Sequence, residues 1–364
     1  MDRNKFVVCS DVHASDYSAF SNPVPGLPYG SRLRIILDAL DTMFKTAQHE
    51  DASRAVIIGD LFNERTSINP IVTQAVINNL VKNLSYMEDG FILDIVVGNH
   101  DQQDNTLIPP NSVSIFNSII VPNKEINVYD HVTYVDNGNS GLIFVPYTEH
   151  ADEFKQEIKD LKLKHPNNVI FAHVGMSGAK SGKWTHKLGG NYSLEDLRYN
   201  EVDLVLMGHY HWRQNLSDNV LYTGDLTPLN FNDEGQSKGF YLVYFDEDKQ
   251  KFNYKFMQVK SPKFETIDLD KLPEDFDLDS EINNNYVRLV THSDEQTKSV
   301  RDLIKSSAVD VAIQSKKQVE QKSRLDISAE NSDSEIVKAY CKEYCPDLSE
   351  LATNYILRAK ESES

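Results

Sequence analysis

The stretch FILDIVVGNHDQQD, residues 91–104, joins a predicted buried strand to a cluster of polar side chains. Its first seven residues are mostly apolar, and Gly98, Asn99, His100 and Asp101 follow at once. A tight turn uses Gly, Asn or Asp because these residues tolerate a positive φ, and it has no need of a histidine. The stretch alone leaves an ordinary turn and a chemical site equally open.

Composition narrows the setting before any other motif is considered. The 364 residues exceed what one hydrophobic core normally serves, so we expect a main domain and a smaller one. The formal net charge of -18 repels nucleic acid at long range and argues against simple groove binding. Three cysteines are too few for a disulfide framework and indicate a reducing compartment. No apolar run reaches membrane-spanning length or resembles a signal peptide, so we expect a soluble, cytoplasmic protein without membrane contact.

Predicted strands alternate with predicted helices up to about residue 261, a pattern typical of an α/β fold. The pattern then changes to one small β-α-β unit. A polar stretch with the composition of a linker follows, and the chain ends in two predicted amphipathic helices broken near Pro346. We therefore expect a main domain at 1–261, a small domain at 262–317, a linker at 318–333 and a helical segment at 334–364.

Five predicted strands each end on side chains that can bind a metal ion. Because the carboxyl ends of strands in such sheets lie along one edge, these side chains can converge. A single histidine at a strand end is usually a packing or surface residue, but five strands ending this way argue against chance. In chain order the residues are Asp11 and His13, then Asp60, then Asn99 and His100, then His173, and then His209 and His211.

The donor types indicate the chemistry. Imidazoles, carboxylates and an amide oxygen suit Mn²⁺, Fe²⁺ or Zn²⁺, and the absence of a thiolate argues against a closed structural zinc site. The donors are too many for one ion, whereas two ions about 3.5–4 Å apart that share a carboxylate would use them. Such a pair neutralises a phosphodiester, generates hydroxide and stabilises the leaving oxygen. This pattern predicts hydrolysis of a phosphate ester.

The motifs DVH, GD, GNHD, AH and GHYH, in this order between residue 6 and about residue 245, resemble those of the calcineurin-like metallophosphoesterases. The resemblance implies a four-layer α/β/β/α core, with the small β-α-β unit as a capping domain. It implies that His100 is no ligand but acts on the scissile phosphate as proton donor or charge stabiliser, oriented by Asp101. The implied ligands are Asp11, His13 and His211 for one metal, Asn99, His173 and His209 for the other, and Asp60 as the bridge.

The surroundings of these motifs resemble the SbcD branch, the double-strand-break repair nucleases of the meiotic recombination eleven type, which include phage recombination endonuclease subunits. The resembling stretches are GDLFNERTSIN, KLGGNYSLEDLRYNEVDLVLMGHYH and VLYTGDLTPLNFNDEGQSKGFYLVYF. The resemblance implies a manganese-dependent DNA exonuclease and endonuclease that acts on ends, hairpins or single strands in repair, recombination or replication. It further implies a homodimer and, for a phage protein, the host cytoplasm.

The same resemblance implies a partner, an SbcC-type coiled-coil ATPase, whose coiled-coil base the helical segment at 334–364 would bind. Docking of these helices onto the chain's own main domain is the alternative. For the activity, the alternative is a phosphodiesterase or phosphatase that acts on a small nucleotide or a phosphoprotein. A non-catalytic interaction subunit would show an eroded ligand set, and the set is intact here.

Three residues depart from the pattern of the SbcD branch. Asn63 stands where Asp is common, which would weaken a hydrogen bond around the metals, and Ala172 replaces the usual Gly before His173. Asp225 stands where Ser is usual, and we expect this extra carboxylate to lie close to the phosphate site and to slow catalysis or change the metal preference.

The stretch GAKSGKWTHK, residues 178–187, is suited to DNA because it combines cations with an aromatic ring that can stack on a base. An ordinary solvated loop is the alternative. The candidate DNA contacts are Lys180, Lys183, Trp184, His186 and Lys187.

Overall fold

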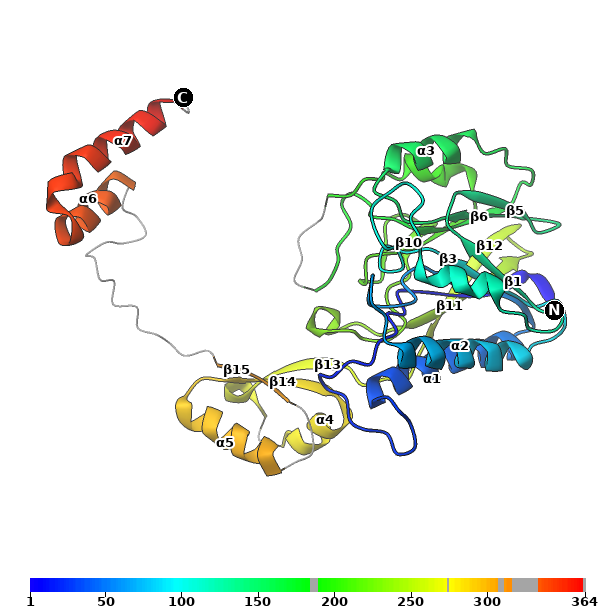
Figure 1. The fold of residues 1–364 in the computed structure, drawn as a ribbon, viewed down its shortest axis with the longest axis horizontal. Helices are drawn as coiled ribbons and strands as arrows, with labels where there is room; N and C mark the ends of the chain where they lie inside the picture. Colours follow the sequence, from blue (N-terminus) through cyan, green and yellow to red (C-terminus); the bar gives the residue numbers. More distant parts are fainter. Residues whose placement is uncertain (184–188, 274, 307–310, 316–332, 363–364) are drawn as a thin grey trace. The chain divides into compact units, whose positions relative to one another are not determined.

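The computed structural model describes residues 1–183, 189–273, 275–306, 311–315 and 333–362 (Figure 1). The chain divides into two compact units, Met1–Ser315 and Lys316–Ser364. Among the described residues, no helix combines the length and the apolar character needed to cross a membrane.

Two six-stranded sheets form the centre of the first unit, and each contains four neighbouring parallel strands. The first sheet has the order β12 (Lys251–Gln258), β11 (Gly239–Asp246), β1 (Asp2–Ser10), β2 (Ala52–Ile58), β3 (Ile92–Val96) and β4 (Glu125–Tyr129). The second has the order β5 (Thr133–Asp136), β6 (Gly141–Val145), β7 (Asn168–His173), β8 (Leu204–Gly208), β10 (Val220–Tyr222) and β9 (Gln214–Asn215). The parallel strands are β1–β2–β3–β4 in the first sheet and β6–β7–β8–β10 in the second. Antiparallel pairing is confined to the β1–β11–β12 side of the first sheet and to the β5–β6 and β9–β10 pairs of the second.

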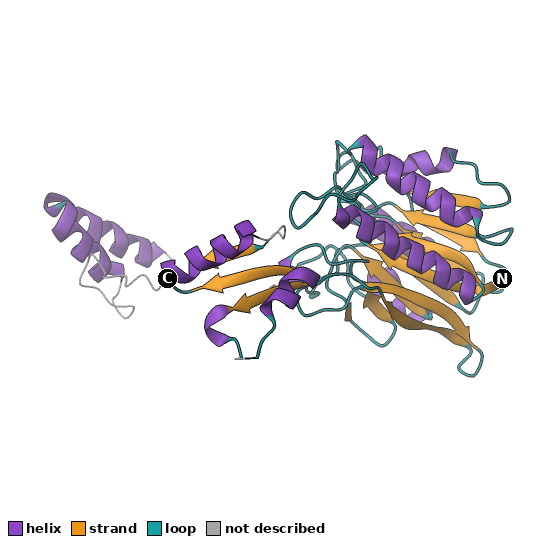
Figure 2. Ribbon diagram, turned by 90° about the horizontal axis from the view of Figure 1, so that it is seen from below, coloured by secondary structure: helices purple, strands orange, loops and turns teal. Residues whose placement is uncertain are grey.

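Side chains alternate along β1 between two hydrophobic cores, because successive residues of a strand point to opposite faces. Val7 and Cys9 lie in the core shared with α1 (Ser31–His49) and α2 (Pro70–Ser85), whereas Phe6 and Val8 lie in the core between the two sheets. Figure 2 shows helices packed along the strands.

The outer face of the second sheet packs against α3 (Ala151–Asp160), whose Phe154 and Ile158 are buried. Together the cores give the layer order α/β/β/α, so the predicted fold class is confirmed. Short 3-10 helices lie in the connections at Ser112–Ser118 (η1), Glu195–Leu197 (η2), Tyr199–Glu201 (η3), Phe231–Asp233 (η4) and Leu269–Lys271 (η5).

A small three-stranded parallel sheet follows in the same unit. Its order is β13 (Phe264–Asp268), β14 (Tyr286–Thr291) and β15 (Ala312–Ser315), with α4 (Leu278–Asn284) and α5 (Asp294–Ser306) between the strands. The sequence predicts only the part from β14 to β15. Strand β13 and helix α4 escape prediction because they are short and lie in an acidic stretch with little apolar periodicity.

The small sheet packs on the main domain through aromatic rings. The ring of Phe20 contacts Phe231, Phe264 and Tyr286 at centroid distances of 5.9, 5.7 and 5.7 Å. The Arg288 guanidinium lies 3.7 Å from the ring centroid of Phe231. The small sheet is thereby attached to the loop that follows β1 and to η4.

The second unit consists of α6 (Asp333–Tyr344), the 3-10 turn η6 (Pro346–Leu348) and α7 (Ser349–Ser362). The break falls at Pro346, where the sequence predicts it. The predicted linker lies outside the described residues except for Asp333, at which α6 begins. Large apolar side chains of this unit are exposed: Tyr340, Tyr344, Leu348, Leu351 and Tyr355.

Candidate metal centre

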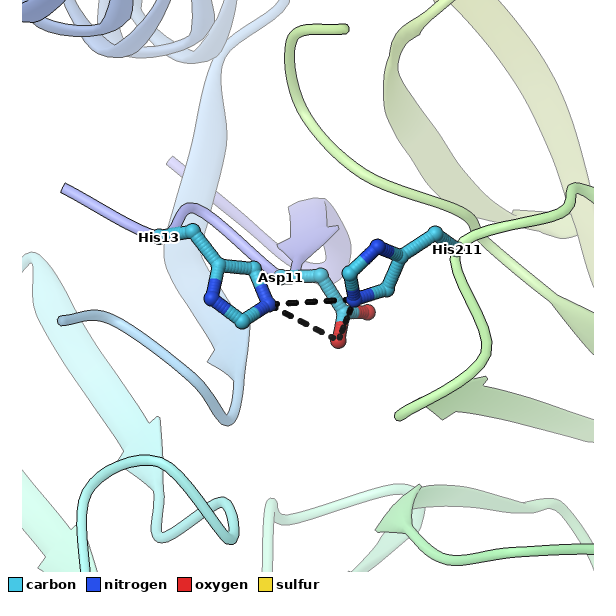
Figure 3. A group of neighbouring side chains, drawn as sticks. All are labelled: Asp11, His13 and His211. Carbon is cyan, nitrogen blue, oxygen red and sulfur yellow. Dashed lines mark hydrogen bonds and ion pairs between the residues drawn. The ribbon is translucent and has the colours of Figure 1, made fainter. Parts of the chain in front are cut away.

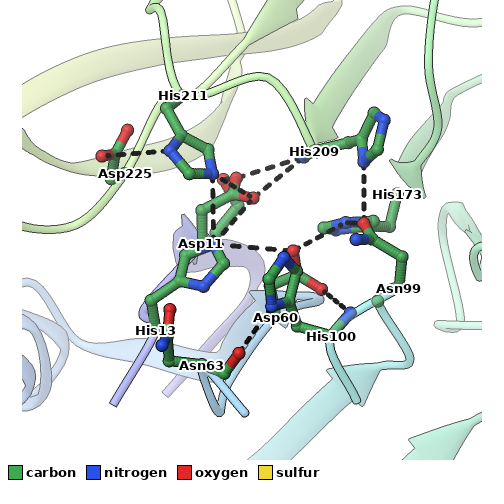
Figure 4. A network of polar contacts seen from close by, with 12 residues as sticks. Asp11, His13, Asp60, Asn63, Asn99, His100, His173, His209, His211 and Asp225 are labelled. Carbon is green, nitrogen blue, oxygen red and sulfur yellow. Dashed lines mark hydrogen bonds and ion pairs between the residues drawn. The ribbon is translucent and has the colours of Figure 1, made fainter. Parts of the chain in front are cut away.

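Side chains from both sheets meet at one place, where the carboxyl ends of the parallel strands lie (Figure 4). The first sheet contributes residues that follow β1, β2 and β3, and the second contributes residues at the ends of β7 and β8. The structure thus brings together all the residues that the strand ends predict: Asp11, His13, Asp60, Asn99, His100, His173, His209 and His211.

Four of these residues have a backbone conformation that L-residues rarely adopt. The φ angles are 49° at Asp11, 46° at His13, 52° at Asp60 and 97° at His209. Each such residue costs on the order of 1–3 kcal/mol and persists only where its surroundings hold it. Backbone hydrogen bonds do so here, because the Asp11 amide donates to the Gly59 carbonyl at 3.2 Å and the His13 amide donates to the Asp60 carbonyl at 2.9 Å. Strain held in this way is typical of a functional site.

One group of donors comprises Asp11, His13 and His211 (Figure 3). The Nε2 atoms of the two imidazoles are 3.1 Å apart, and Asp11 Oδ1 lies 3.9 Å from each of them. Asp11 and His13 are buried, whereas the His211 side chain is 25% exposed. Three donor atoms of nitrogen and oxygen that face one another in this way fit one divalent ion of the Mn²⁺, Fe²⁺ or Zn²⁺ type.

A second group lies beside the first. Asn99 Oδ1 is 3.1 Å from His173 Nε2 and 2.8 Å from His209 Nδ1. Asp60 Oδ2 lies between the groups, 3.4 Å from His173 Nε2 and 3.5 Å from His13 Nε2. This position suits a carboxylate that bridges two ions, and the donor set fits the metal pair that the sequence predicts.

The protonation of the imidazoles follows from burial and from Asp60. Burial, followed by the charge of His211, lowers the pKa of His13 well below its usual value, and burial and His173 lower that of His209 to about 3. Both rings are therefore neutral and have a lone pair for a metal ion. Burial also lowers the pKa of His173, but the ion pair with Asp60 outweighs it and raises that pKa to about 9. Burial raises the pKa of Asp60, and His173 more than offsets this, so the carboxylate stays ionised.

The His100 ring stands at the edge of the first group, 4.7 Å between centroids from the His13 ring. Its Nδ1 lies 2.6 Å from the carbonyl oxygen of Asn63, and its backbone amide donates to Asp60 Oδ1 at 2.8 Å. The contact with Asn63 fixes the ring and leaves Nε2 available. Because a backbone carbonyl makes this contact, it does not depend on the side chain at position 63. The side-chain amide of Asn63 donates to Glu64 Oε1 at 3.3 Å, and the expectation that Asn weakens a hydrogen bond around the metals stays a prediction.

Asp101 contacts backbone amides of the loops around the site. Its fully buried carboxylate accepts hydrogen bonds from three backbone amides, those of Asp60 and Gly98 at 2.9 Å each and that of Phe62 at 3.3 Å. The prediction that Asp101 orients the His100 ring directly is therefore wrong. The carboxylate instead joins the loop after β2 to the loop after β3, because buried backbone amides there need an acceptor.

The candidate DNA loop is described only in part, since Trp184, His186 and Lys187 lie outside the described residues. Lys180 is exposed, and its backbone amide donates to Gln214 Oε1 at 3.0 Å. The Lys183 ammonium is paired with Glu234 at 3.2 Å.

Asp225 is fully buried, and its Oδ2 lies 3.7 Å from Nδ1 of His211, so the extra carboxylate lies beside a residue of the site. Its expected effect on catalysis or metal preference stays a prediction. Asp225 Oδ1 lies 3.0 Å from the ammonium of Lys238, whose side chain is only 1% exposed. Lys238 thus forms an ion pair with the extra carboxylate. The sequence offers no signal for this lysine beyond one basic residue before a predicted strand.

With this geometry established, the comparison with known proteins gives the class. Residues 4–213 match the calcineurin-like phosphoesterase family, and the chain belongs to that family of metal-dependent hydrolases. Because the donors described above are those of a divalent metal site, the family and the geometry agree.

Individual relatives are distant. The chain is 25% identical over 218 residues to putative phosphoesterase 078R of Invertebrate iridescent virus 3, which covers 57% of this chain and 56% of that protein. It is 22% identical over 220 residues to exonuclease subunit 1 of Enterobacteria phage T4, 60% of each protein. It is 23% identical over 245 residues to a subunit of the nuclease SbcCD of Escherichia coli K12, 58% of this chain and 59% of that protein. The chain thus spans less than two thirds of the length of these relatives.

Proposed function

We propose that this protein is a DNA nuclease of the SbcD type, which hydrolyses phosphodiester bonds with two divalent metal ions, Mn²⁺ being the physiological choice. The observation that carries the hydrolytic part is the position of Asp60 Oδ2, 3.4 and 3.5 Å from imidazoles of two separate donor groups. Bound metal ions would supply a hydroxide at neutral pH and neutralise the phosphate.

In this proposal some side chains bind the metal ions, one contacts the phosphate and others position these groups. Asp11, His13 and His211 would hold one ion, Asn99, His173 and His209 would hold the other, and Asp60 would be shared. His100 contacts the scissile phosphate through Nε2, where it stabilises charge or donates a proton to the leaving oxygen. The Asn63 carbonyl keeps the His100 ring in place for this step. Asp101 fixes the loops that carry Asp60 and His100.

Two observations support DNA as the substrate. The relatives named as an exonuclease subunit and as a subunit of the nuclease SbcCD share the matched region with this chain. The small sheet is attached next to the metal centre, because the Tyr17 hydroxyl donates to the His13 carbonyl at 2.9 Å and the Arg32 guanidinium lies 4.0 Å from the Tyr17 ring and 5.3 Å from that of Tyr286 in β14. A cap placed there suits an extended substrate.

The net charge of -18 favours a second candidate, a phosphodiesterase or phosphatase for a small nucleotide or a phosphoprotein. A strongly acidic surface repels a polyanion at long range. Two divalent ions reverse the local field of the site, however, so the acidity does not forbid DNA.

The exposed apolar side chains of α6 and α7 support a protein partner, and the SbcC-type coiled-coil ATPase is the partner we propose. Tyr344, Leu351 and Tyr355 are 53%, 56% and 68% exposed. Two short helices with such a surface fit helix-in-groove binding. A homodimer of the main domain completes the proposed assembly.

The experiment compares substrates. The purified chain is incubated with Mn²⁺ and labelled duplex, hairpin and single-stranded DNA, a cyclic nucleotide and a phosphoprotein, with Asp60→Asn as the control for contaminating nucleases. We expect cleavage of DNA that Asp60→Asn lacks. Turnover of the cyclic nucleotide or the phosphoprotein without cleavage of DNA would establish the second candidate instead.

A further inference from the structure

A buried group of charges lies behind His211, on the side of the ring away from His13. The ring presents Nε2 to His13 at 3.1 Å, and its Nδ1 lies 3.7 Å from Asp225 Oδ2 (Figure 4). Asp225, Asp233 and Lys238 form the group, and their side chains are 0%, 1% and 1% exposed. Charged side chains are seldom buried to this degree unless they are paired with an opposite charge or bind a metal ion.

Lys238 connects the group to the backbone of His211. Its ammonium donates to Asp225 Oδ1 at 3.0 Å, to Asp233 Oδ1 at 2.8 Å and to the carbonyl oxygen of His211 at 2.8 Å. These contacts use the three donors of an ammonium group. Lys238 therefore fixes the Asp225 carboxylate relative to the His211 main chain.

Asp233 is held from its other side, since its Oδ2 accepts from the backbone amides of Leu229 at 2.9 Å and Asn230 at 3.1 Å. His211, Asp225 and Asp233 also lie close enough together to suggest a metal site of their own. The Lys238 ammonium contacts both carboxylates, however, and supplies the positive charge that a metal ion would otherwise bring.

Within the described part of the chain, one buried atom of the group has no hydrogen-bond partner, Asp225 Oδ2. Its distance of 3.7 Å to His211 Nδ1 is too long for a hydrogen bond. A buried carboxylate oxygen left unsatisfied is costly, so its presence calls for a reason. The imidazole beside it belongs to a proposed metal ligand, and ligating histidines ordinarily donate their other N–H to a carboxylate or carbonyl.

We infer that Asp225 is a positioning residue for His211, with Lys238 as its support. The carboxylate favours the tautomer of His211 that carries hydrogen on Nδ1, so that the Nε2 lone pair is available to the metal ion shared with Asp11 and His13. This inference rests on the proposed two-metal centre and adds to it a supporting role for Asp225 and Lys238.

The change Asp225→Asn tests the tautomer. Lys238 can only donate hydrogen bonds, so the amide oxygen of the new side chain must stay on Lys238 and its NH₂ group must face His211. That NH₂ group favours the tautomer with hydrogen on Nε2, which cannot bind a metal through that atom. Asp233→Asn is the matched control, because it makes the same change on the same lysine but no ion pair joins Asp233 to His211 among the described contacts.

The measurement is a Mn²⁺ titration of the full-length chain without substrate, followed by the electron paramagnetic resonance signal of free Mn²⁺. We expect two bound ions in the wild type and a loss of about 10–100-fold in affinity for one of them in Asp225→Asn, the usual effect of removing such a partner of a ligand. His211→Gln identifies the affected ion, and Asp233→Asn retains both affinities. Thermal unfolding of the metal-free variants shows whether each is folded. If Asp225→Asn does not fold, Asp225→Ser is measured in its place.

Two results would overturn the inference. Unchanged affinities in both Asp225→Asn and Asp225→Ser would show that the carboxylate does not act on His211, and an equal loss in Asp233→Asn would assign the effect to the charge on Lys238. Both results are Mn²⁺ affinities measured without substrate, so neither tests the proposed catalytic activity. A wild-type chain that binds fewer than two Mn²⁺ ions would contradict the proposed two-metal centre itself, and a chain that binds two ions without cutting DNA would leave the inference intact.

Discussion

Metal binding by this protein should release a proton from His173, and the structure gives the size of the effect. The Nδ1 of His173 lies 2.8 Å from the Ile58 carbonyl, so its hydrogen stays on that side and Nε2 faces Asp60 Oδ2 at 3.4 Å. Without metal, Nε2 carries a second proton, because the ion pair with Asp60 outweighs burial and raises the His173 pKa to about 9. A metal ion that uses Nε2 must displace that proton.

The size of the effect on metal affinity follows from the competition between the proton and the metal ion for Nε2 of His173. At pH 7, below a pKa of about 9, the displaced proton weakens metal binding by roughly 100-fold. Because the pKa of His173 is raised, the ring keeps its second proton below about pH 9 and loses it above that pH. Affinity should therefore rise about tenfold per pH unit from pH 7 toward pH 9 and then level off.

The assay is calorimetric titration of Mn²⁺ under nitrogen at pH 7, in two buffers that differ in ionisation enthalpy, which counts released protons. His173→Gln is the control, because its amide oxygen can still contact a metal ion and carries no titrating proton. We expect the wild type to release about one proton more than His173→Gln. Equal proton release by the two proteins would refute the assigned protonation of His173.

Three further predictions follow from the site and the second unit. Asp60→Asn should abolish hydrolysis and lower the Mn²⁺ content, because the shared carboxylate is lost; full activity with reduced metal would contradict the two-metal assignment. His100→Ala should retain both metal ions and DNA binding but lose at least about 100-fold in rate, and a collapse of its metal content like that of His209→Ala would make His100 a ligand. Truncation after Lys322 should leave a folded Mn²⁺-dependent nuclease that no longer co-purifies with the SbcC-type ATPase. Retained association would place the interface elsewhere, and an insoluble product would show that α6 and α7 belong to the chain's own core.

The candidate donors can be predicted from the sequence because their signal is local. Each lies at or just after the end of an apolar strand, and the carboxyl ends of parallel strands share an edge, so convergence follows from the fold class alone. His173 illustrates this, since it is the last residue of β7 and meets Asn99, which follows β3 in the other sheet.

The contacts that support the site could not be predicted in the same way. The Asn63 group that fixes His100 is a backbone carbonyl, which every residue has, so the identity of residue 63 says nothing about it. Asp101 follows His100 directly in the sequence, but two of its three partners are the amides of Asp60 and Phe62, about 40 residues away. Partners brought together by tertiary packing leave no periodic signal in the chain.

The site also joins the two sheets, and this couples metal binding to the stability of the whole core. Asp11 and Asp60 follow strands of the first sheet, whereas His173 and His209 belong to the second. Among the contacts that cross the junction, the His209 amide donates to Asp11 Oδ1 at 3.0 Å, and His173 Nδ1 contacts the Ile58 carbonyl at 2.8 Å. A ligand that binds only the folded state stabilises it by about 2.7 kcal/mol at 100 times its dissociation constant. Because the donors come from both sheets, a chelator should lower the unfolding temperature of the entire core, and not only loosen the loops around the site.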